Sequence, residues 1–297
     1  MLSPHMDRLI GVFLVALSAA CFGTNAIFAR IGYDAGANVS TFLFMRFAIA
    51  SLVLFLIMTA RGLNFPRGRL LVSLALIGGI GLTGATLSFY TAIQLAPVNL
   101  VIVIAYMYPT MVTMLAAMFL KQPITGYKIV ALLMTLVGIL FTIGLDSGGY
   151  VLGIILAIVT AIFYSLYLVF GSKSIQRAGP FSASTVIIIS AAVFYSVIVG
   201  LQGLQMPKIP SGWLAVVASA LFSTVLGIMA LFEGLKRIDT ANAAIISTFE
   251  VVVVVVLAVL FLGETITLHK ILGACLVIGA VIILAKSEYR ISQAQIR

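Results

Sequence analysis

Long apolar runs alternate with short polar connections along the whole chain. Ten runs of about 20 residues can be distinguished, and an α-helix of that length crosses the hydrocarbon core of a bilayer. The runs cover 9–29, 39–60, 69–93, 97–119, 127–145, 150–171, 182–201, 212–235, 240–262 and 269–286. The pattern therefore predicts an all-α integral membrane protein with ten transmembrane helices.

A repeated heptapeptide divides the chain into two halves. Phe-Leu-Lys-Gln-Pro-Ile-Thr at 119–125 is similar to Phe-Leu-Gly-Glu-Thr-Ile-Thr at 261–267, and 261 − 119 gives an offset of 142 residues. A period this long indicates a repeated structural unit rather than a solenoid repeat. We predict one five-helix repeat over 1–146 and a second over 147–297, joined by a short turn at Asp146–Gly149.

An odd number of crossings in each half means that the second half enters the membrane from the opposite side. The two repeats are therefore expected to be inverted. Inverted repeats are typical of secondary transporters, which place the substrate site near the bilayer midplane and expose it alternately to the two sides. One chain of this kind can enclose a site, so a monomer is sufficient and a dimer stays open.

The connections between the runs are short, so sequential helices are expected to pack as antiparallel neighbours. We expect Asp239 or Thr240 to cap the helix that begins there. Glu233 precedes Lys236 and Arg237 by about one helical turn, which predicts a local ion pair. Four glycines crowd the third run, and they favour either close helix packing or a flexing gate. They are Gly78, Gly79, Gly81 and Gly84.

Composition agrees with a membrane protein, because 63% of residues are hydrophobic and 8% are charged. In soluble proteins about a quarter are charged. The net charge of +9 does not indicate nucleic-acid binding, since no soluble domain is predicted that would carry a basic face.

The basic residues are distributed unequally between the two sides of the membrane. With the N-terminus inside, thirteen fall in inner segments, three in outer segments, and Arg46 within the second run. The inner ones are Arg8, Arg61, Arg67, Arg69, Lys121, Lys128, Lys173, Arg177, Lys236, Arg237, Lys286, Arg290 and Arg297, and the outer ones are Arg30, Lys208 and Lys270. This positive-inside pattern predicts both termini in the cytoplasm.

Polar positions inside the runs form pairs under the 142-residue offset. The first run carries Ser18, Phe22 and Asn25 on one helical face, and the sixth carries Thr160, Tyr164 and Tyr167 at the corresponding positions. A face that stays partly polar in both repeats is expected to turn away from lipid and line a shared central cavity. The alternative is hydrogen bonding between helices or back to the same helix.

The third and fourth runs add further candidates for the substrate site. Thr86, Tyr90 and Gln94 form a polar stripe in the third run. In the fourth, Tyr106 and Tyr108 lie on different faces, and the sequence does not choose which face lines the cavity. Aromatic residues in membrane helices are more often packing or interface anchors than ligand contacts. Tyr90 and Tyr164 are the two we favour as contacts.

Two charged residues lie well within predicted helices, where an unpaired charge is costly. Arg46 is in the second run and Glu250 near the middle of the ninth, with Ser247 one turn before it and Tyr108 as its repeat mate. Glu250 is the stronger candidate, either to hold a substrate ammonium group or to carry a proton for coupling. A structural ion pair between Arg46 and Glu250 is the alternative.

Several motifs resemble the EamA-type members of the drug/metabolite transporter superfamily. They are Met45-Arg46-Phe47, Ser247-Thr-Phe-Glu250, Leu262-Gly-Glu264, and Gly273 followed by Gly279. The chain departs from the family pattern at Val251, where a proline is common, and at Lys121-Gln122-Pro123, where Gly-Glu is common. Glu264 is therefore read as a structural element at a helix end near the outer surface.

The resemblance implies ten helices in two inverted repeats and export of small metabolites across a bacterial inner (cytoplasmic) membrane. Amino acids are the favoured substrate class, and aromatic or other hydrophobic ones fit the candidate residues best. Export of a flavin, nucleoside or amine is the alternative. We expect no ATP-driven pumping, because no phosphate-binding Gly-Lys-Ser/Thr loop occurs.

An intramembrane enzyme and a channel are the competing classes. Chemistry on phosphorylated lipids needs clustered carboxylates for a metal, and the acidic residues here are scattered. Cys21 and Cys275 are the only cysteines, and His5 and His269 are far apart, so no metal or cofactor is expected. A channel would show rows of selective polar groups. The expected partners are a small-molecule substrate and the lipid bilayer.

Overall fold

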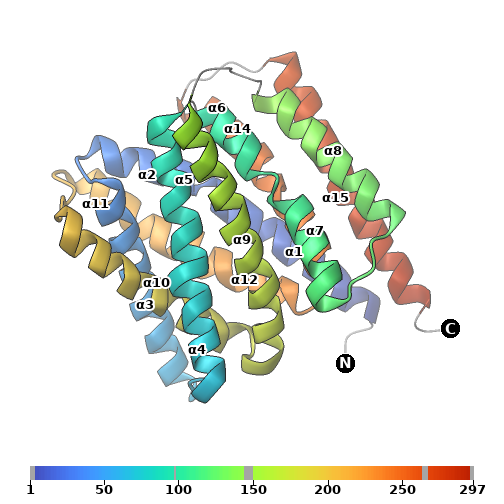
Figure 1. The fold of residues 1–297 in the computed structure, drawn as a ribbon, viewed down its shortest axis with the longest axis horizontal. Helices are drawn as coiled ribbons and strands as arrows, with labels where there is room; N and C mark the ends of the chain where they lie inside the picture. Colours follow the sequence, from blue (N-terminus) through green and yellow to red (C-terminus); the bar gives the residue numbers. More distant parts are fainter. Residues whose placement is uncertain (1–3, 97, 144–149, 263–266, 295–297) are drawn as a thin grey trace.

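The computed structural model describes residues 4–96, 98–143, 150–262 and 267–294, and in these ranges the regular structure is entirely helical. The turn predicted at Asp146–Gly149, the repeat boundary within it, and the helix end predicted at Glu264 fall outside the described residues. Helix α1 (Pro4–Gly23) begins and helix α15 (Leu268–Ala294) ends toward the lower right of Figure 1.

Most predicted runs form helices that could cross a bilayer. Seven described stretches are long and apolar enough, and three shorter apolar helices accompany them. The long stretches are Met6–Asp34, Val39–Ala60, Gly68–Leu95, Val151–Ala178, Pro210–Leu235, Pro180–Gln202 and Thr240–Phe261, and the shorter ones are Tyr108–Leu120, Gly126–Phe141 and Ile271–Ser287. The multi-pass all-α class is confirmed, and the count of ten crossings stays a prediction.

Helices occur in the same order in the two halves. The first half contains α1 (Pro4–Gly23), α2 (Asn25–Asp34), α3 (Val39–Ala60), α4 (Gly68–Leu76), η1 (Ile77–Leu82), α5 (Thr83–Leu95), α6 (Val98–Ala105), α7 (Tyr108–Leu120) and α8 (Gly126–Ile143). The second contains α9 (Val151–Ala178), α10 (Pro180–Gln202), α11 (Pro210–Ala218), η2 (Ser219–Leu226), α12 (Gly227–Leu235), α13 (Thr240–Ser247), α14 (Phe249–Leu262) and α15 (Leu268–Ala294).

Packing between the halves follows the 142-residue offset. Helices at corresponding positions pack on each other, namely α3 on α10 and α8 on α15, the latter pair running side by side at the right of Figure 1. Helix α1 packs on α12 in the same way that α9 packs on α5. The first predicted helix of each half therefore packs against the third predicted helix of the other half. The interior is built from helices of both halves.

Two helices are interrupted at corresponding positions. A turn at Tyr106 and Met107 separates α6 from α7, and a turn at Thr248 separates α13 from α14, with 248 − 142 = 106. Pro109 in the first turn of α7 lacks an N–H group and favours a helix start there. The Thr248 hydroxyl donates to the Ile245 carbonyl at 2.6 Å, which satisfies one acceptor at the second break.

Two π-helical segments also begin 142 residues apart, η1 at Ile77 and η2 at Ser219. A π-helical turn is wider than an α-helical one and is frequent at functional sites. In each segment a threonine hydroxyl bonds the carbonyl five residues earlier, Thr83 to Gly78 and Thr224 to Ser219, both at 3.2 Å. These bonds satisfy carbonyls inside the bilayer, where water is not available.

The glycines of the third predicted helix serve close packing. A Cβ atom added at Gly78 would overlap the backbone carbonyl of Ile187 in α10, and one added at Gly79 would overlap the ring of Phe194. Gly81 and Gly84 face Tyr167 and Phe163 of α9. The close-packing interpretation of these glycines is therefore confirmed.

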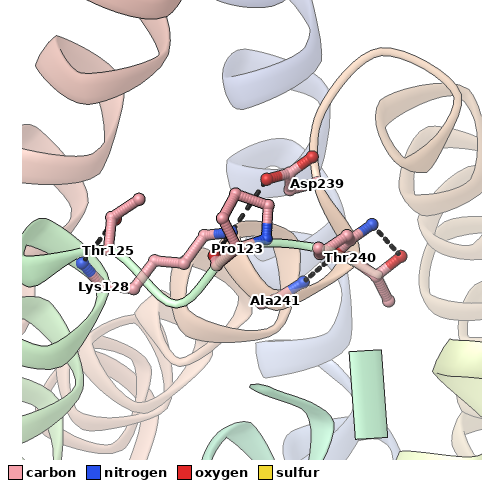
Figure 2. A network of polar contacts seen from close by, with 7 residues as sticks. Pro123, Thr125, Lys128, Asp239, Thr240 and Ala241 are labelled. Atoms are coloured by element: carbon pink, nitrogen blue, oxygen red, sulfur yellow. Dashed lines mark hydrogen bonds and ion pairs between the residues drawn. The ribbon is translucent and has the colours of Figure 1, made fainter. Parts of the chain in front are cut away.

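A polar cluster ties the α7–α8 connection to the start of α13, as Figure 2 shows. Lys128 Nζ donates to Asp239 Oδ2 at 2.8 Å and to the Pro123 carbonyl at 2.9 Å. Thr240 donates from Oγ1 to Ser172 of α9 at 2.9 Å. Asp239 is the N-cap residue of α13, one of the two positions predicted, but its side chain makes no cap hydrogen bond. The buried ammonium of Lys128 draws the Asp239 carboxylate away instead.

The ion pair predicted at Glu233 is confirmed and has Arg237 as its partner, with Nη1 and Oε2 2.5 Å apart. Arg237 also pairs with Asp7 near the start of α1, with Nε and Oδ1 3.1 Å apart. The arginine therefore links the start of α1 to the end of α12.

We expect Gly78→Ala to lower the stability of the protein by about 1–3 kcal/mol, because the added methyl meets backbone that cannot rotate away. Gly200→Ala in α10 is the matched control, since a Cβ atom there meets nothing within 4 Å. Thermal unfolding in detergent measures both. Equal melting temperatures for Gly78→Ala and the wild type would contradict the packing at Gly78.

We expect Asp239→Asn to destabilise the protein by about 1–3 kcal/mol, between the effect of an exposed ion pair and that of a buried one. The Lys128 side chain is 3% exposed and would keep its charge without a carboxylate. Asp34→Asn is the control, because its pair with Arg30 is exposed at 69% and 68%. Chemical or thermal unfolding compares the two, and a larger loss for Asp34→Asn would contradict the assignment.

Candidate functional site

The polar side chains of the interior gather around Arg46 of α3, which is 5% exposed. Its Nε donates to Thr224 Oγ1 in η2 at 2.6 Å. Its Nη1 is buried and has no hydrogen-bond partner among the described residues. The guanidinium also lies over the Phe47 ring, 5.1 Å from the centroid. Arg46 thus spans the two halves of the molecule with part of its bonding capacity unused.

A chain of hydrogen bonds from three helices lies beside Arg46. Ser219 of η2 donates to Asn25 Oδ1 at 2.8 Å, and Asn25 Nδ2 donates to the Tyr90 hydroxyl of α5 at 3.0 Å. Tyr90 in turn interacts with the Arg46 guanidinium. At the α1–α2 turn, Thr24 bonds Ser223 of η2 at 3.0 Å. These contacts fix the orientation of Asn25 and Tyr90 relative to Arg46.

Glu250 occupies the first turn of α14, directly after the break at Thr248. A helix N-terminus carries partial positive charge and favours a carboxylate. Tyr106 interacts with the Glu250 side chain, and Tyr90, Tyr108 and Tyr164 lie close enough for electrostatic interaction with it. Glu250 keeps part of its surface accessible, although it lies among residues from four helices.

No ion pair joins Arg46 and Glu250 in the described part of the chain, although the two charges interact across the interior. Tyr90 interacts with both of them. The structural pairing that the sequence left open is therefore not made. The two opposite charges face one interior region, with neutral hydroxyl groups beside them.

A row of aromatic rings extends from Glu250 toward α12. The Tyr106 and Tyr108 ring centroids are 5.8 Å apart, Tyr108 and Tyr164 are 4.8 Å apart, and Tyr164 and Tyr167 are 5.6 Å apart. The Tyr108–Tyr164 pair is edge-to-face at 83°, a favourable aromatic geometry. Tyr106 and Tyr108 both interact with Glu250, and the Tyr108 hydroxyl donates to the Ala244 carbonyl at 3.2 Å. Which face of the fourth helix lines the cavity stays a prediction.

The predicted site residues fall into two groups in space. Asn25 and Tyr90 lie by Arg46, Tyr108 and Tyr164 interact with Glu250, and Tyr167 packs between Tyr164 and Phe232. Ser247 is buried, and its side chain interacts with that of Tyr108. Phe22 packs against Gly227 of α12.

The remaining predicted residues lie apart from these charges or bond elsewhere. Thr160 donates back to the Leu156 carbonyl at 2.9 Å, as the alternative interpretation expected. Ser18 is fully buried and has no partner among the described residues. Thr86 bonds the Tyr195 hydroxyl at 2.7 Å, and Gln94 is exposed at the end of α5.

Sequence reasoning missed the η2 side of the site. Ser219, Ser223 and Thr224 contact Asn25, Thr24 and Arg46, and Tyr33 and Tyr195 lie near Arg46. Hydroxyl residues are common in membrane helices, and the offset relates Thr224 to Leu82, so the repeat gave no signal. In the described ranges no three His, Cys, Asp or Glu side chains gather as metal ligands would.

These features define a multi-pass helical membrane protein with charged groups held in its interior, as in a transporter. The sequence profile of the EamA-like transporter family matches the chain twice, at residues 9–144 and 151–286. The chain therefore belongs to this family. The two matches begin 142 residues apart, the same spacing as the repeated heptapeptide.

Named relatives are also transporters. The chain is 25% identical over 288 residues to "Uncharacterized transporter YyaM" of Bacillus subtilis (strain 168), covering 92% of this chain and 93% of the relative. It is 24% identical over 273 residues to "Threonine/homoserine exporter RhtA" of Salmonella typhimurium (strain SL1344), covering 91% and 88%. The family and these relatives are transporters rather than enzymes.

A solved crystal structure shares the fold. It superposes with a TM-score of 0.82 over 94% of this chain and 97% of that chain, at 20% sequence identity. At this identity the likeness concerns the fold alone. The arrangement of helices is thus one that an experimentally solved protein also adopts.

We expect Thr224→Val to lower stability by about 1.5–3 kcal/mol, because Arg46 Nε loses its acceptor inside the protein. Thr224→Ser keeps the hydroxyl and is expected to retain most of the stability. Thermal unfolding in detergent compares the two variants with the wild type. If the serine variant is as unstable as the valine variant, the methyl group rather than the hydroxyl bond is important there.

Proposed function

We propose that this protein is a secondary transporter that exports small organic metabolites across the cell inner membrane by alternating access. Amino acids are the favoured substrate class, with aromatic or other hydrophobic ones preferred. The site would lie between the two repeats, near the bilayer midplane. Its members would include Arg46, Glu250, Tyr90, Tyr108 and Tyr164.

The pair of helix breaks is the observation that carries this proposal. In transporters with inverted repeats, helices interrupted at corresponding positions of the two halves form the substrate site. Here the breaks at Tyr106 and Thr248 correspond under the offset, and Glu250 and Tyr108 follow them directly. Irregular backbone at membrane depth is tolerated where it is covered by protein or lines a polar cavity.

The proposed topology has ten crossings with both termini in the cytoplasm. The seven long stretches and the three shorter apolar helices add up to ten. Two inverted repeats over 1–146 and 147–297 would account for the exchange of packing partners between the halves, in which α1 meets α12 as α9 meets α5. A single chain contains all members of the site, so a monomer would be sufficient.

Two observations bear on the substrate. A relative of the chain is named for export of threonine and homoserine, which are polar amino acids. The aromatic side chains of Tyr106 and Tyr164 are partly exposed and interact with Glu250, which favours a larger apolar side chain on the substrate. The α-amino and α-carboxylate groups are common to both kinds of substrate.

Counterflow in proteoliposomes tests the function directly. Vesicles loaded with one compound are exposed to the labelled compound outside, using threonine, homoserine, phenylalanine, an amine, a nucleoside and a flavin. Saturable exchange of an amino acid is the expected result. Linear flux that never saturates would indicate a channel. Absence of flux with every compound would contradict the transporter assignment.

We expect Glu250→Gln to reduce amino-acid counterflow by about tenfold or more, because a hydrogen bond to a charged group contributes about 1.5–3 kcal/mol and 1.4 kcal/mol is a factor of ten. Asp34→Asn is the control, since it removes an exposed carboxylate in α2. Size-exclusion chromatography verifies that both variants stay folded. Unchanged flux and unchanged pH dependence in Glu250→Gln would remove Glu250 from the mechanism.

A further inference from the structure

We propose that Arg46 and Glu250 are the two ends of one dipolar binding site, where Arg46 binds the carboxylate of a small zwitterion and Glu250 binds its ammonium group. This inference rests on the proposed transport function and names the substrate chemistry of the same site. It requires both charges on one ligand, and it assigns a separate task to each protein residue.

The bonding of Arg46 assigns it to an anion. A guanidinium offers five N–H donors in a planar fork that suits a carboxylate. Thr224 accepts a hydrogen bond from Nε and Tyr90 bonds the Arg46 side chain, while Nη1 has no partner among the described residues. A buried charge without a partner is strongly destabilising. The Arg46 fork therefore lacks the group that a ligand carboxylate supplies.

The other polar groups around Arg46 do not supply this anion. Tyr33, Tyr90 and Tyr195 interact with the guanidinium, and tyrosine hydroxyls ordinarily ionise only near pH 10. Glu250 is the acidic group that interacts with Arg46, and it makes no ion pair with it. Glu250 therefore interacts with Arg46 without pairing with it, so neither charge is neutralised by direct contact with the other.

The surroundings of Glu250 suit an ammonium group. Tyr106, Tyr108 and Tyr164 lie around the carboxylate, and a cation gains from aromatic faces as well as from a carboxylate. Tyr106 and Tyr164 are partly exposed rather than fully buried. Cationic side chains other than Arg46 do not interact with Glu250 among the described residues. An ammonium group would thus meet the carboxylate without a competing protein cation.

Tyr90 sets the geometry between the two ends. It interacts with both Arg46 and Glu250, and its hydroxyl is held by Asn25, which Ser219 holds in turn. These hydrogen bonds thereby hold the Tyr90 side chain in place. A ligand that carries both charges on neighbouring atoms, as an α-amino acid does, satisfies both ends at once. An anion or a cation alone leaves one buried charge unpaired.

Analogue competition on the wild-type protein tests the proposal without any mutation. Counterflow of labelled phenylalanine is competed with phenylalanine, 2-phenylethylamine, which lacks the carboxylate, and 3-phenylpropionate, which lacks the amine. Threonine, 1-amino-2-propanol and 3-hydroxybutyrate form the matching polar series. We expect each single-charge analogue to compete about 100-fold less well than its amino acid, because it leaves one buried group unpaired. Equal competition by all three members of a series would overturn the dipolar site.

Two variants then assign the ends. Arg46→Gln is expected to improve competition by the amine relative to competition by the amino acid by about tenfold or more, because the substrate carboxylate has lost its partner. Glu250→Gln is expected to do the same for the acid. This crossed pattern is specific, since a merely unstable protein would lose all three compounds alike. If both variants shift the amine and the acid in the same direction, the assignment is wrong.

Controls separate this proposal from the transport function itself. Arg30→Gln and Asp34→Asn change the same kinds of group in an exposed pair of α2 and are expected to keep the wild-type selectivity. Absence of counterflow in the wild type for every compound contradicts the transport function. Counterflow that is inhibited equally by the amino acid, the amine and the acid overturns the dipolar site but not the transport function. Glu250→Gln with wild-type selectivity but no proton-driven accumulation would assign Glu250 to proton coupling and overturn its role here.

Discussion

Polar groups inside a bilayer must find their partners within the protein, and the structure follows from that constraint. The buried ammonium of Lys128 likewise finds partners within the protein, namely Asp239 and the Pro123 carbonyl. The same constraint accounts for the threonine hydroxyls that cover carbonyls in η1 and η2. Arg46 satisfies the constraint only in part, because Nη1 lacks a partner among the described residues. Where this requirement is incompletely met, a ligand is the natural complement.

Much of the fold follows from apolar run length alone. The run at 39–60 predicts α3, which covers Val39–Ala60. The run at 240–262 gives the right ends for α13 and α14, but it continues through Thr248 and does not indicate the break. A single threonine is compatible with an unbroken membrane helix, since its hydroxyl can bond back to the preceding turn. The two π-helical segments could not be predicted either, because the length of an apolar run does not indicate the number of residues per turn.

The candidate site was partly accessible to sequence reasoning because charges inside apolar runs are rare. Arg46 and Glu250 stand out for this reason, and the repeat offset leads from Glu250 to Tyr108. Thr224 could not be found in the same way, because its role is to accept a bond from an arginine 178 residues away. Whether Thr160 faced a cavity or its own helix was likewise undecidable from the sequence, since both choices use the same face. Tertiary placement decides such cases.

The opposite charges of Arg46 and Glu250 sum to zero within one region of the protein, and this matters in a polarised membrane. An electric potential acts on a carrier only through the net charge that moves, at about 2.3 kcal/mol per elementary charge for each 100 mV. A zwitterion held between the two residues adds no net charge. The loaded site would therefore cross the field electroneutrally, and the direction of flux would follow concentration gradients rather than voltage.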